Sequence, residues 1–232
     1  MKRVAPEALP ANQGRILKQY FHVLLRHFGP QRWWPARTRL GIILGAILTQ
    51  NTSWLNAERA LRQLRKSKLF AIGRLRAMPR SELAGQIHSA GFFRQKAGTI
   101  HNFLNWLGSQ HGGSLSQLFA TPPDEARRGL LSVRGIGPET ADVIQLYAGR
   151  NPTFVADAYT RRILARHGLL PPGASYEAAR RFLHEHLPPD HSLFNEFHAL
   201  LVETGKRFCL RNEPRCNTCP LRPFLPQSWK AH

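Results

Sequence analysis

The residues best suited to chemistry lie between positions 131 and 166. A glycine turn, Gly135-Ile136-Gly137, is followed at once by an expected helix, and a single carboxylate, Asp157, heads the next expected helix. Glycines leave no side chain between the backbone and a phosphate, and the free N–H groups at a helix start attract anions. A carboxylate near such a grip indicates chemistry on a nucleotide. The structural alternatives are an ordinary glycine corner between helices and a plain N-cap.

The composition supports a polyanionic partner. The chain has 232 residues, with 33 Lys and Arg against 14 Asp and Glu, a formal net charge of +19. Such a balance favours nucleic acid, because binding releases counterions, although an inert basic surface would show the same count. A hydrophobic share of 42% favours a folded globule over a ribosomal-type chain. The longest apolar run, 40–48, is too short to span a membrane, and the start has no secretory h-region, so we expect a cytoplasmic protein.

Helical periodicity dominates the chain, and we expect an all-α protein with few or no strands. The expected helices cover 16–28, 39–50, 81–89, 96–107, 124–131, 138–147, 157–167, 176–186 and 192–206. We expect two helical domains with a DNA-binding cleft between them. One is a bundle at 36–150 that contains a helix-hairpin-helix at about 124–147. The other combines 1–35 with 151–232 and ends in a cysteine loop at 209–225.

Several motifs occur in one order along the chain. They are ILTQNT at 47–52, GFFRQKA at 91–97, and L-x-V-x-GIG-x-x-TA-x-x-I followed by FV-x-D-x-YTRR. Together they resemble the helix-hairpin-helix (HhH-GPD) DNA glycosylase superfamily, the relatives of endonuclease III, over about residues 30–220. The resemblance implies a base-excision-repair enzyme that binds double-stranded DNA with damaged bases, and a fold that needs no partner subunit. It also implies that Asp157 is the catalytic carboxylate.

One position departs from the endonuclease III pattern. Those enzymes carry a lysine two residues after the second hairpin glycine, and this chain has Glu139 there. A carboxylate cannot form the Schiff base that strand cutting by the lyase route needs. We therefore expect a monofunctional glycosylase. Glu139 also suits the start of a helix, where the dipole favours an acid.

Two tryptophans sharpen the expected substrate. The segments 32–37 and 45–54, with the glutamate, are most similar to the bacterial 3-methyladenine DNA glycosylases, in which the residues matching Trp34 and Trp54 sandwich the flipped base. Two indole faces would hold a cationic alkylated purine by cation–π attraction of about 1–2 kcal/mol. The alternative is that both tryptophans belong to the core, where we expect Trp33.

The resemblance also implies which residues contact DNA. Gln50 would enter the stack that the flipped base leaves, and Phe92 or Phe93 would wedge the opposite strand; we favour Phe93. Lys96 is a candidate phosphate contact, although a solvated charge is the alternative. The implied hairpin contacts are Gly135, Ile136, Gly137 and Thr140.

The three cysteines lie together near the C-terminus. The family's iron–sulfur loop is C-x6-C-x2-C-x5-C, and Cys209, Cys216 and Cys219 match its first three positions. The fourth position holds Leu225, whereas a 4Fe-4S cubane normally takes four thiolates. Three alternatives stay open: a cluster with another ligand, a zinc site that borrows a histidine, and a metal-free loop held by packing.

The sequence thus predicts a monofunctional DNA glycosylase for alkylated purines such as 3-methyladenine. Within the same class, the alternative is a mismatch or oxidised-base glycosylase, whose neutral target would favour hydrogen-bonding side chains over indoles. A different class, a non-catalytic helix-hairpin-helix DNA-binding protein, would leave Asp157 as a cap alone. A further alternative retains lyase activity through another lysine.

Overall fold

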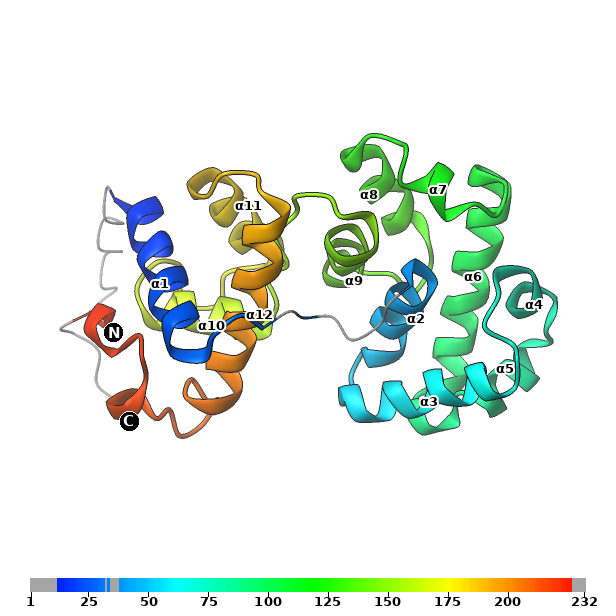
Figure 1. The fold of residues 1–232 in the computed structure, drawn as a ribbon, viewed down its shortest axis with the longest axis horizontal. Helices are drawn as coiled ribbons and strands as arrows, with labels where there is room; N and C mark the ends of the chain where they lie inside the picture. Colours follow the sequence, from blue (N-terminus) through cyan, green and yellow to red (C-terminus); the bar gives the residue numbers. More distant parts are fainter. Residues whose placement is uncertain (1–11, 32, 34–37, 227–232) are drawn as a thin grey trace, which may run out of the picture. The chain divides into compact units, whose positions relative to one another are not determined.

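The computed structural model describes residues 12–31, 33 and 38–226. Within them every regular element is helical, which confirms the expected all-α class (Figure 1). The chain divides into two compact units, 34–151 and 1–33 with 152–232, close to the expected division at 36–150.

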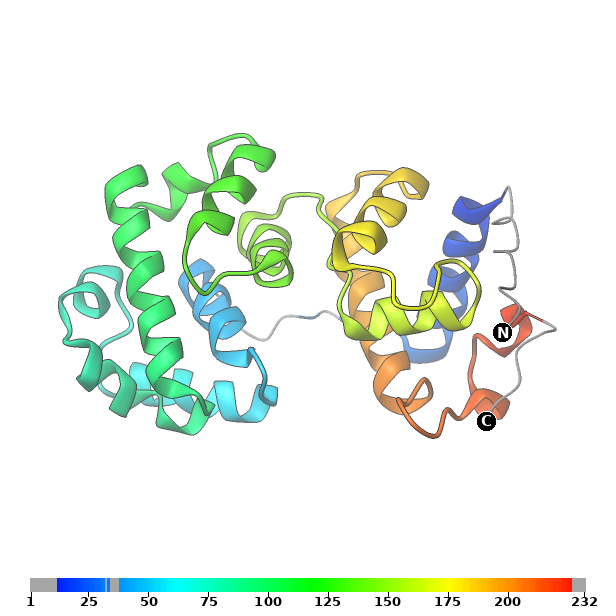
Figure 2. The same cartoon turned by 180° about the vertical axis from the view of Figure 1, so that it is seen from behind.

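The 34–151 unit is built around two helices, α2 and α6. The nine residues 40–48 of α2 are all buried, so this helix is apolar on every side, as its sequence predicts. It packs against α3, α6 and the turn η2 (Figure 2). The elements of this unit are α2 (Arg39–Thr49), α3 (Trp54–Lys66), α4 (Ile72–Ala77), α5 (Arg80–Gln86), η1 (His88–Ala90), α6 (Phe93–His111), α7 (Leu115–Leu118), α8 (Pro123–Ser132), α9 (Pro138–Val143) and η2 (Ile144–Gly149).

The other unit packs three helices around α12. Helix α12 contacts α10 and α1, and α11 contacts α1. Its core is aromatic: Phe154, Phe194 and Phe197 are fully buried and meet edge to face. The elements are α1 (Gln13–Phe28), α10 (Ala158–Arg166), α11 (Tyr176–His186), α12 (His191–Arg207), η3 (Cys216–Thr218) and η4 (Arg222–Phe224).

Two differences from the expected helices have physical reasons. Helix α3 was not predicted, because half of its buried residues (Ala57, Ala60, Leu61 and Leu64) are alanines and all of them stand among arginines and glutamines. The expected helix at 138–147 changes after α9 into a π-helical turn, η2, which ends at Arg150 in the left-handed region with φ 58°. Such wide turns occur mostly within α-helices and often near functional sites.

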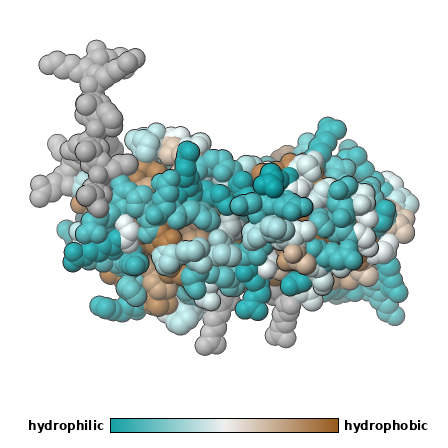
Figure 3. Space-filling model, turned by 90° about the horizontal axis from the view of Figure 1, so that it is seen from above, coloured by the Kyte–Doolittle hydropathy of each residue, from teal (hydrophilic) through white to brown (hydrophobic). Residues whose placement is uncertain are grey.

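The surface agrees with the composition. Hydrophilic side chains cover most of the face seen in Figure 3, with small apolar areas between them. No helix in the described part of the chain is long and apolar enough to cross a membrane.

Helices α8 and α9 form the expected helix-hairpin-helix, and an ion pair joins them. Arg127 of α8 donates to both carboxylate oxygens of Asp142 in α9, at 2.7 and 3.1 Å. The Asp142 carboxylate is fully buried, so loss of the arginine would leave a charge without its bidentate partner. The pair thus fixes the two helices on either side of the turn.

The first hairpin glycine is required by the backbone. Gly135 has φ 100°, a region that residues with a Cβ rarely adopt, and a Cβ there would lie 2.1 Å from the Thr99 hydroxyl oxygen of α6. Gly137 has an ordinary φ of −93°, and a Cβ there would meet open space. The fold therefore needs the first glycine and tolerates a methyl group at the second.

We expect Gly135→Ala to lower the free energy of unfolding by about 1–3 kcal/mol, because the backbone strain and the contact with Thr99 cannot both be relieved. Gly137→Ala is the matched control and should change it by less than about 1 kcal/mol. Urea denaturation followed by circular dichroism measures both. Equal losses in the two variants would contradict this account of the turn.

Candidate active site

Asp157 lies at the N-terminus of α10 in the 1–33 and 152–232 unit. Its carboxylate Oδ1 accepts the backbone N–H of Thr160 at 2.8 Å, so Asp157 is the N-cap, a role that stabilises a helix by about 1 kcal/mol. Only 9% of the residue is exposed. Asp157 therefore does cap the helix, as the structural alternative states. Capping uses only Oδ1, so Oδ2 can make other contacts.

That second oxygen lies close to a histidine. Nε2 of His198, from α12, is 3.7 Å from Oδ2 of Asp157, and His198 is itself buried. Burial pushes the pKa of Asp157 upward, but the adjacent His198 ring, with the Thr160 N–H, outweighs it and holds the pKa below its ordinary value. The site thus keeps a nearly buried carboxylate ionised at neutral pH.

His198 is covered in turn by Trp33. The two rings are stacked, with centroids 5.4 Å apart and planes at 27°, and the Lys206 ammonium lies 5.5 Å from the Trp33 ring. Trp33 was expected in the core, but it is only half-buried. It stacks on His198, which in turn lies next to Asp157. Sequence reasoning missed His198, because a histidine inside the apolar run of α12 forms no motif with a residue on another helix.

Gln50, in the 34–151 unit, is bound to the hairpin. Its side-chain Nε2 donates to the Gly135 carbonyl at 3.0 Å and to the Thr140 hydroxyl at 2.9 Å. Gln50 follows the end of α2, and the next residue, Asn51, has φ 53° in the left-handed region. These bonds hold the glutamine beside the glycine turn. Its predicted entry into the DNA stack would require it to exchange them for bonds to bases.

The hairpin exposes its glycines and buries Ile136 and Thr140. Ile136 is 5% exposed and its N–H donates to the Val133 carbonyl, so it anchors the turn, as the sequence indicates. Thr140 is 8% exposed and its hydroxyl accepts from Gln50. Of the four hairpin residues proposed to contact DNA, Gly135 and Gly137 are exposed. Backbone contact at these glycines is the mode that the geometry favours.

The structure favours Phe92 over Phe93 as the wedge. Phe92 is 62% exposed and has a left-handed backbone with φ 45°, an unusual conformation for a bulky side chain. Phe93 is half-buried and packs against His88, with ring centroids 4.5 Å apart. An exposed phenylalanine on a strained backbone is the better candidate for insertion between bases.

Lys96 is not placed as the surface phosphate contact that we expected. It is 3% exposed, and its ammonium donates to the carbonyls of Leu48 and Ala90, each at 2.8 Å. Burial lowers its pKa. These two carbonyls precede Gln50 and Phe92 by two residues each, so Lys96 ties together the two segments that carry them.

The base-pocket residues are only partly described. Trp34 lies outside the described residues. Trp54 begins α3 and is half-buried, while Glu139 is exposed in the first turn of α9, where the helix dipole favours an acid. Their proposed contact with a base therefore stays a prediction.

The cysteine loop is held by arginines of α10. Arg162 donates to the Cys209 carbonyl at 2.7 Å, and Arg166 donates to the Leu210 and Arg211 carbonyls at 2.6 and 2.8 Å. These bonds satisfy the backbone at the C-terminal end of α12 and at the start of the loop.

The donors in this loop do not make up the set of a usual cubane. Cys209, Cys216 and Cys219 line one small cavity, and Leu225, in the fourth position, lines it with an apolar side chain. His167 also lines it, but its Nδ1 is bound to the Tyr20 hydroxyl at 2.7 Å. Among the described residues, no group of three or more His, Cys, Asp or Glu side chains is arranged to hold a metal ion.

Comparisons with known proteins agree with this geometry. A protein of Methanocaldococcus jannaschii that is named as a DNA repair glycosylase is 37% identical over 215 residues, which are 92% of this chain and 97% of the relative. Two solved structures share the fold. An endonuclease III trapped as a covalent DNA intermediate has a TM-score of 0.79 at 20% identity, covering 92% of this chain and 96% of the other. The Helicobacter pylori 3-methyladenine DNA glycosylase has 0.73 at 24%, covering 86% and 99%.

The family described as HhH-GPD superfamily base excision DNA repair protein matches residues 44–189. This range contains the α2 end with Gln50, the glycine hairpin and Asp157. The chain therefore belongs to the HhH-GPD superfamily of base-excision-repair DNA glycosylases.

Proposed function

We propose that this DNA glycosylase is monofunctional and hydrolyses the N-glycosidic bond of alkylated purines such as 3-methyladenine. The observation that carries the proposal is the Asp157 carboxylate, which is nearly buried and kept ionised, with one oxygen bound by the Thr160 N–H and the other beside His198. We further propose that the protein acts as a monomer on chromosomal DNA in the cytoplasm.

The chemistry asked of Asp157 is modest. An alkylated purine carries positive charge and leaves with the electrons of the C1′–N bond, so no strong general acid is needed. The departing base leaves a cationic, oxocarbenium-like sugar, which a nearby carboxylate stabilises. A water then attacks C1′, and Asp157 accepts its proton before passing it to solvent. His198 and the Thr160 N–H hold the carboxylate in place for both steps.

The choice of substrate rests on the residues of the proposed pocket. Glu139 supplies negative charge at the hairpin helix, which suits a cationic base better than a neutral one. Trp34 and Trp54 would add cation–π attraction. A mismatch or oxidised-base target would instead need hydrogen-bonding partners for its edges. No other described feature favours such a target.

Asp157→Asn separates catalysis from capping, because asparagine caps a helix about as well as aspartate but carries no charge. We expect the wild type to release 3-methyladenine from methylated DNA, and the variant to lose at least about a hundredfold in rate while its melting temperature changes little. Chromatography of the bases released from a panel of methylated, uracil, mismatched-thymine and 8-oxoguanine DNA measures the substrate and the rate, and thermal denaturation measures the melting temperature. Release of a neutral base with none of 3-methyladenine would contradict the substrate, and a fully active variant would remove Asp157 from its role.

Borohydride trapping tests the absence of lyase chemistry. We expect no covalent adduct between the wild type and lesion-containing DNA, whereas Glu139→Lys, which places an amine where lyase relatives carry one, should give a trapped adduct. Lys96 is the other amine to watch, because burial lowers its pKa and so leaves it more often neutral. An adduct that forms with the wild type and disappears in Lys96→Met would overturn the monofunctional proposal.

The role of His198 is tested by the pH dependence of kcat. Catalysis needs Asp157 ionised, so activity falls as the pH drops through its folded-state pKa, which lies below the ordinary range. In His198→Leu the effect of burial on Asp157 is no longer offset by the histidine, so the pKa of Asp157 should rise. The acidic side of the plot of kcat against pH should therefore move to higher pH. His198→Gln keeps a hydrogen-bond donor and should move it less. An unchanged acidic side in His198→Leu, with circular dichroism showing the protein folded, would contradict this role.

A further inference from the structure

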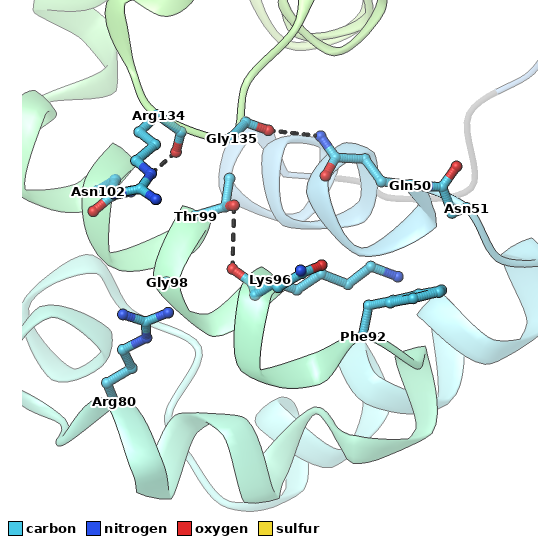
Figure 4. Close-up of a pocket in the computed structure, with 11 residues that line it drawn as sticks. Gln50, Asn51, Arg80, Phe92, Lys96, Gly98, Thr99, Asn102, Arg134 and Gly135 are labelled. Atoms are coloured by element: carbon cyan, nitrogen blue, oxygen red, sulfur yellow. Dashed lines mark hydrogen bonds between the residues drawn. The ribbon is translucent and has the colours of Figure 1, made fainter.

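The 34–151 unit contains a water-accessible hollow of about 410 Å³ beside the glycine hairpin. At one end it is lined by Gln50 and Phe92, the residues proposed to enter the DNA stack. At the other end it is lined by two arginines, Arg80 and Arg134 (Figure 4). Neither arginine belongs to the hairpin contacts or to the base pocket described above.

Arg80 is held in place and is not a freely moving surface charge. Its guanidinium lies directly over Gly98 of α6, where a Cβ would come within 2.4 Å of Nη2, and the same nitrogen donates to the Arg94 carbonyl at 3.2 Å. The residue nevertheless remains exposed to solvent. Because Gly98 has no side chain, the Arg80 guanidinium packs against the helix there and lines the hollow. Most of the N–H groups of Arg80 remain available to a ligand.

Arg134 is presented by the hairpin itself. It directly precedes Gly135, and its carbonyl accepts from the Asn102 side chain of α6 at 3.0 Å, which fixes its backbone. Its side chain is exposed and also lines the hollow. The turn that exposes its glycines therefore also carries a positive charge, and Gly135 lines the same hollow.

The charge of the hollow has one sign. No acidic residue lines it, and neither arginine forms a salt bridge within the described part of the chain. The remaining polar lining includes the amides Gln95 and Asn102. Partial burial and then the charge of Arg80 lower the pKa of His101. Forked guanidinium donors without a carboxylate match the oxygens of a phosphate.

We propose that this hollow is a second phosphate-binding site, in which Arg80 and Arg134 hold a backbone phosphate of the DNA next to the stack that Gln50 and Phe92 enter. The inference rests on the DNA glycosylase function of the chain. A phosphate held there fixes the register of the duplex, as phosphate contacts do, while the damaged nucleotide turns out of the helix.

The first test is the salt dependence of binding to a short duplex that carries a tetrahydrofuran abasic-site analogue. Each phosphate contact contributes about −0.9 to the slope of log K against log salt. We expect Arg80→Gln with Arg134→Gln to make the slope shallower by at least about 0.9 and to weaken binding at low salt by roughly tenfold. Arg59→Gln is the matched control, since Arg59 is exposed on α3 and does not line the hollow. A double variant with the slope of the control would overturn the proposal.

The second test locates the phosphate. Single neutral methylphosphonates are placed in turn along both strands of the same duplex, and the affinity of each is measured. We expect at least one position that weakens the wild type and leaves the double variant unaffected, because the variant has already lost that contact. Equal effects on both proteins at every position would overturn the site.

These measurements use binding and not base release, so they fail separately from the proposed function. A wild type that shows the position-specific contact but releases no alkylated purine would refute the substrate and keep the site. A wild type that releases the base, with no difference in DNA binding between the double variant and Arg59→Gln, would refute the phosphate site and keep the substrate. Melting temperatures of all variants verify that each protein is folded.

Discussion

The close approach of the hairpin backbone to α6 at Gly135 is the contact on which the DNA-facing side of the 34–151 unit depends. The turn reaches φ 100° with its Cα against the Thr99 side chain, and the carbonyl of the same residue receives the Gln50 amide. One glycine therefore connects the hairpin to two helices, α6 and α2. Because packed interiors transmit small displacements, a change here would shift the glutamine, the turn and the hollow together.

The Asp157 carboxylate has a structural role that conflicts little with the chemical role proposed for it. One oxygen caps α10, and the other lies near His198, which is stacked on Trp33. A capped carboxylate cannot rotate freely, so the bond that stabilises the helix also orients the oxygen proposed to face the sugar. Because one aspartate can serve both purposes, the sequence alone does not distinguish a helix-capping aspartate from a catalytic one.

Much of the architecture follows from local patterns. Helices α8, α10, α11 and α12 begin and end within a residue or so of the expected positions, because apolar periodicity, N-caps and prolines agree there. The motif residues Gly135, Ile136 and Asp157 also lie where the sequence placed them, since backbone conformation and capping are local properties. Helix α3 escaped prediction because only two of its four buried residues, Leu61 and Leu64, have large apolar side chains, and charged residues flank them in the sequence.

The differences between the expected and observed surroundings concern residues whose neighbours come from distant parts of the chain. Lys96 and Phe93 look like exposed groups in a DNA-binding motif, yet the lysine is enclosed by the carbonyls of Leu48 and Ala90, and Phe92 takes the exposed position. A lysine next to an arginine and a glutamine gives no local signal that it is buried.

The order of residues alone predicted an all-helical protein, and its motifs resembled those of DNA glycosylases with a glycine turn, one carboxylate and Glu139 at the position of the lyase lysine, because motifs of this kind are single residue types at fixed spacings. Burial, pairing and side-chain direction are different, since they depend on which helices meet. Packing of α10 against α12 brought His198 to Asp157, and packing of α5 against α6 seated Arg80 over Gly98. Neither pairing has a signature along the chain.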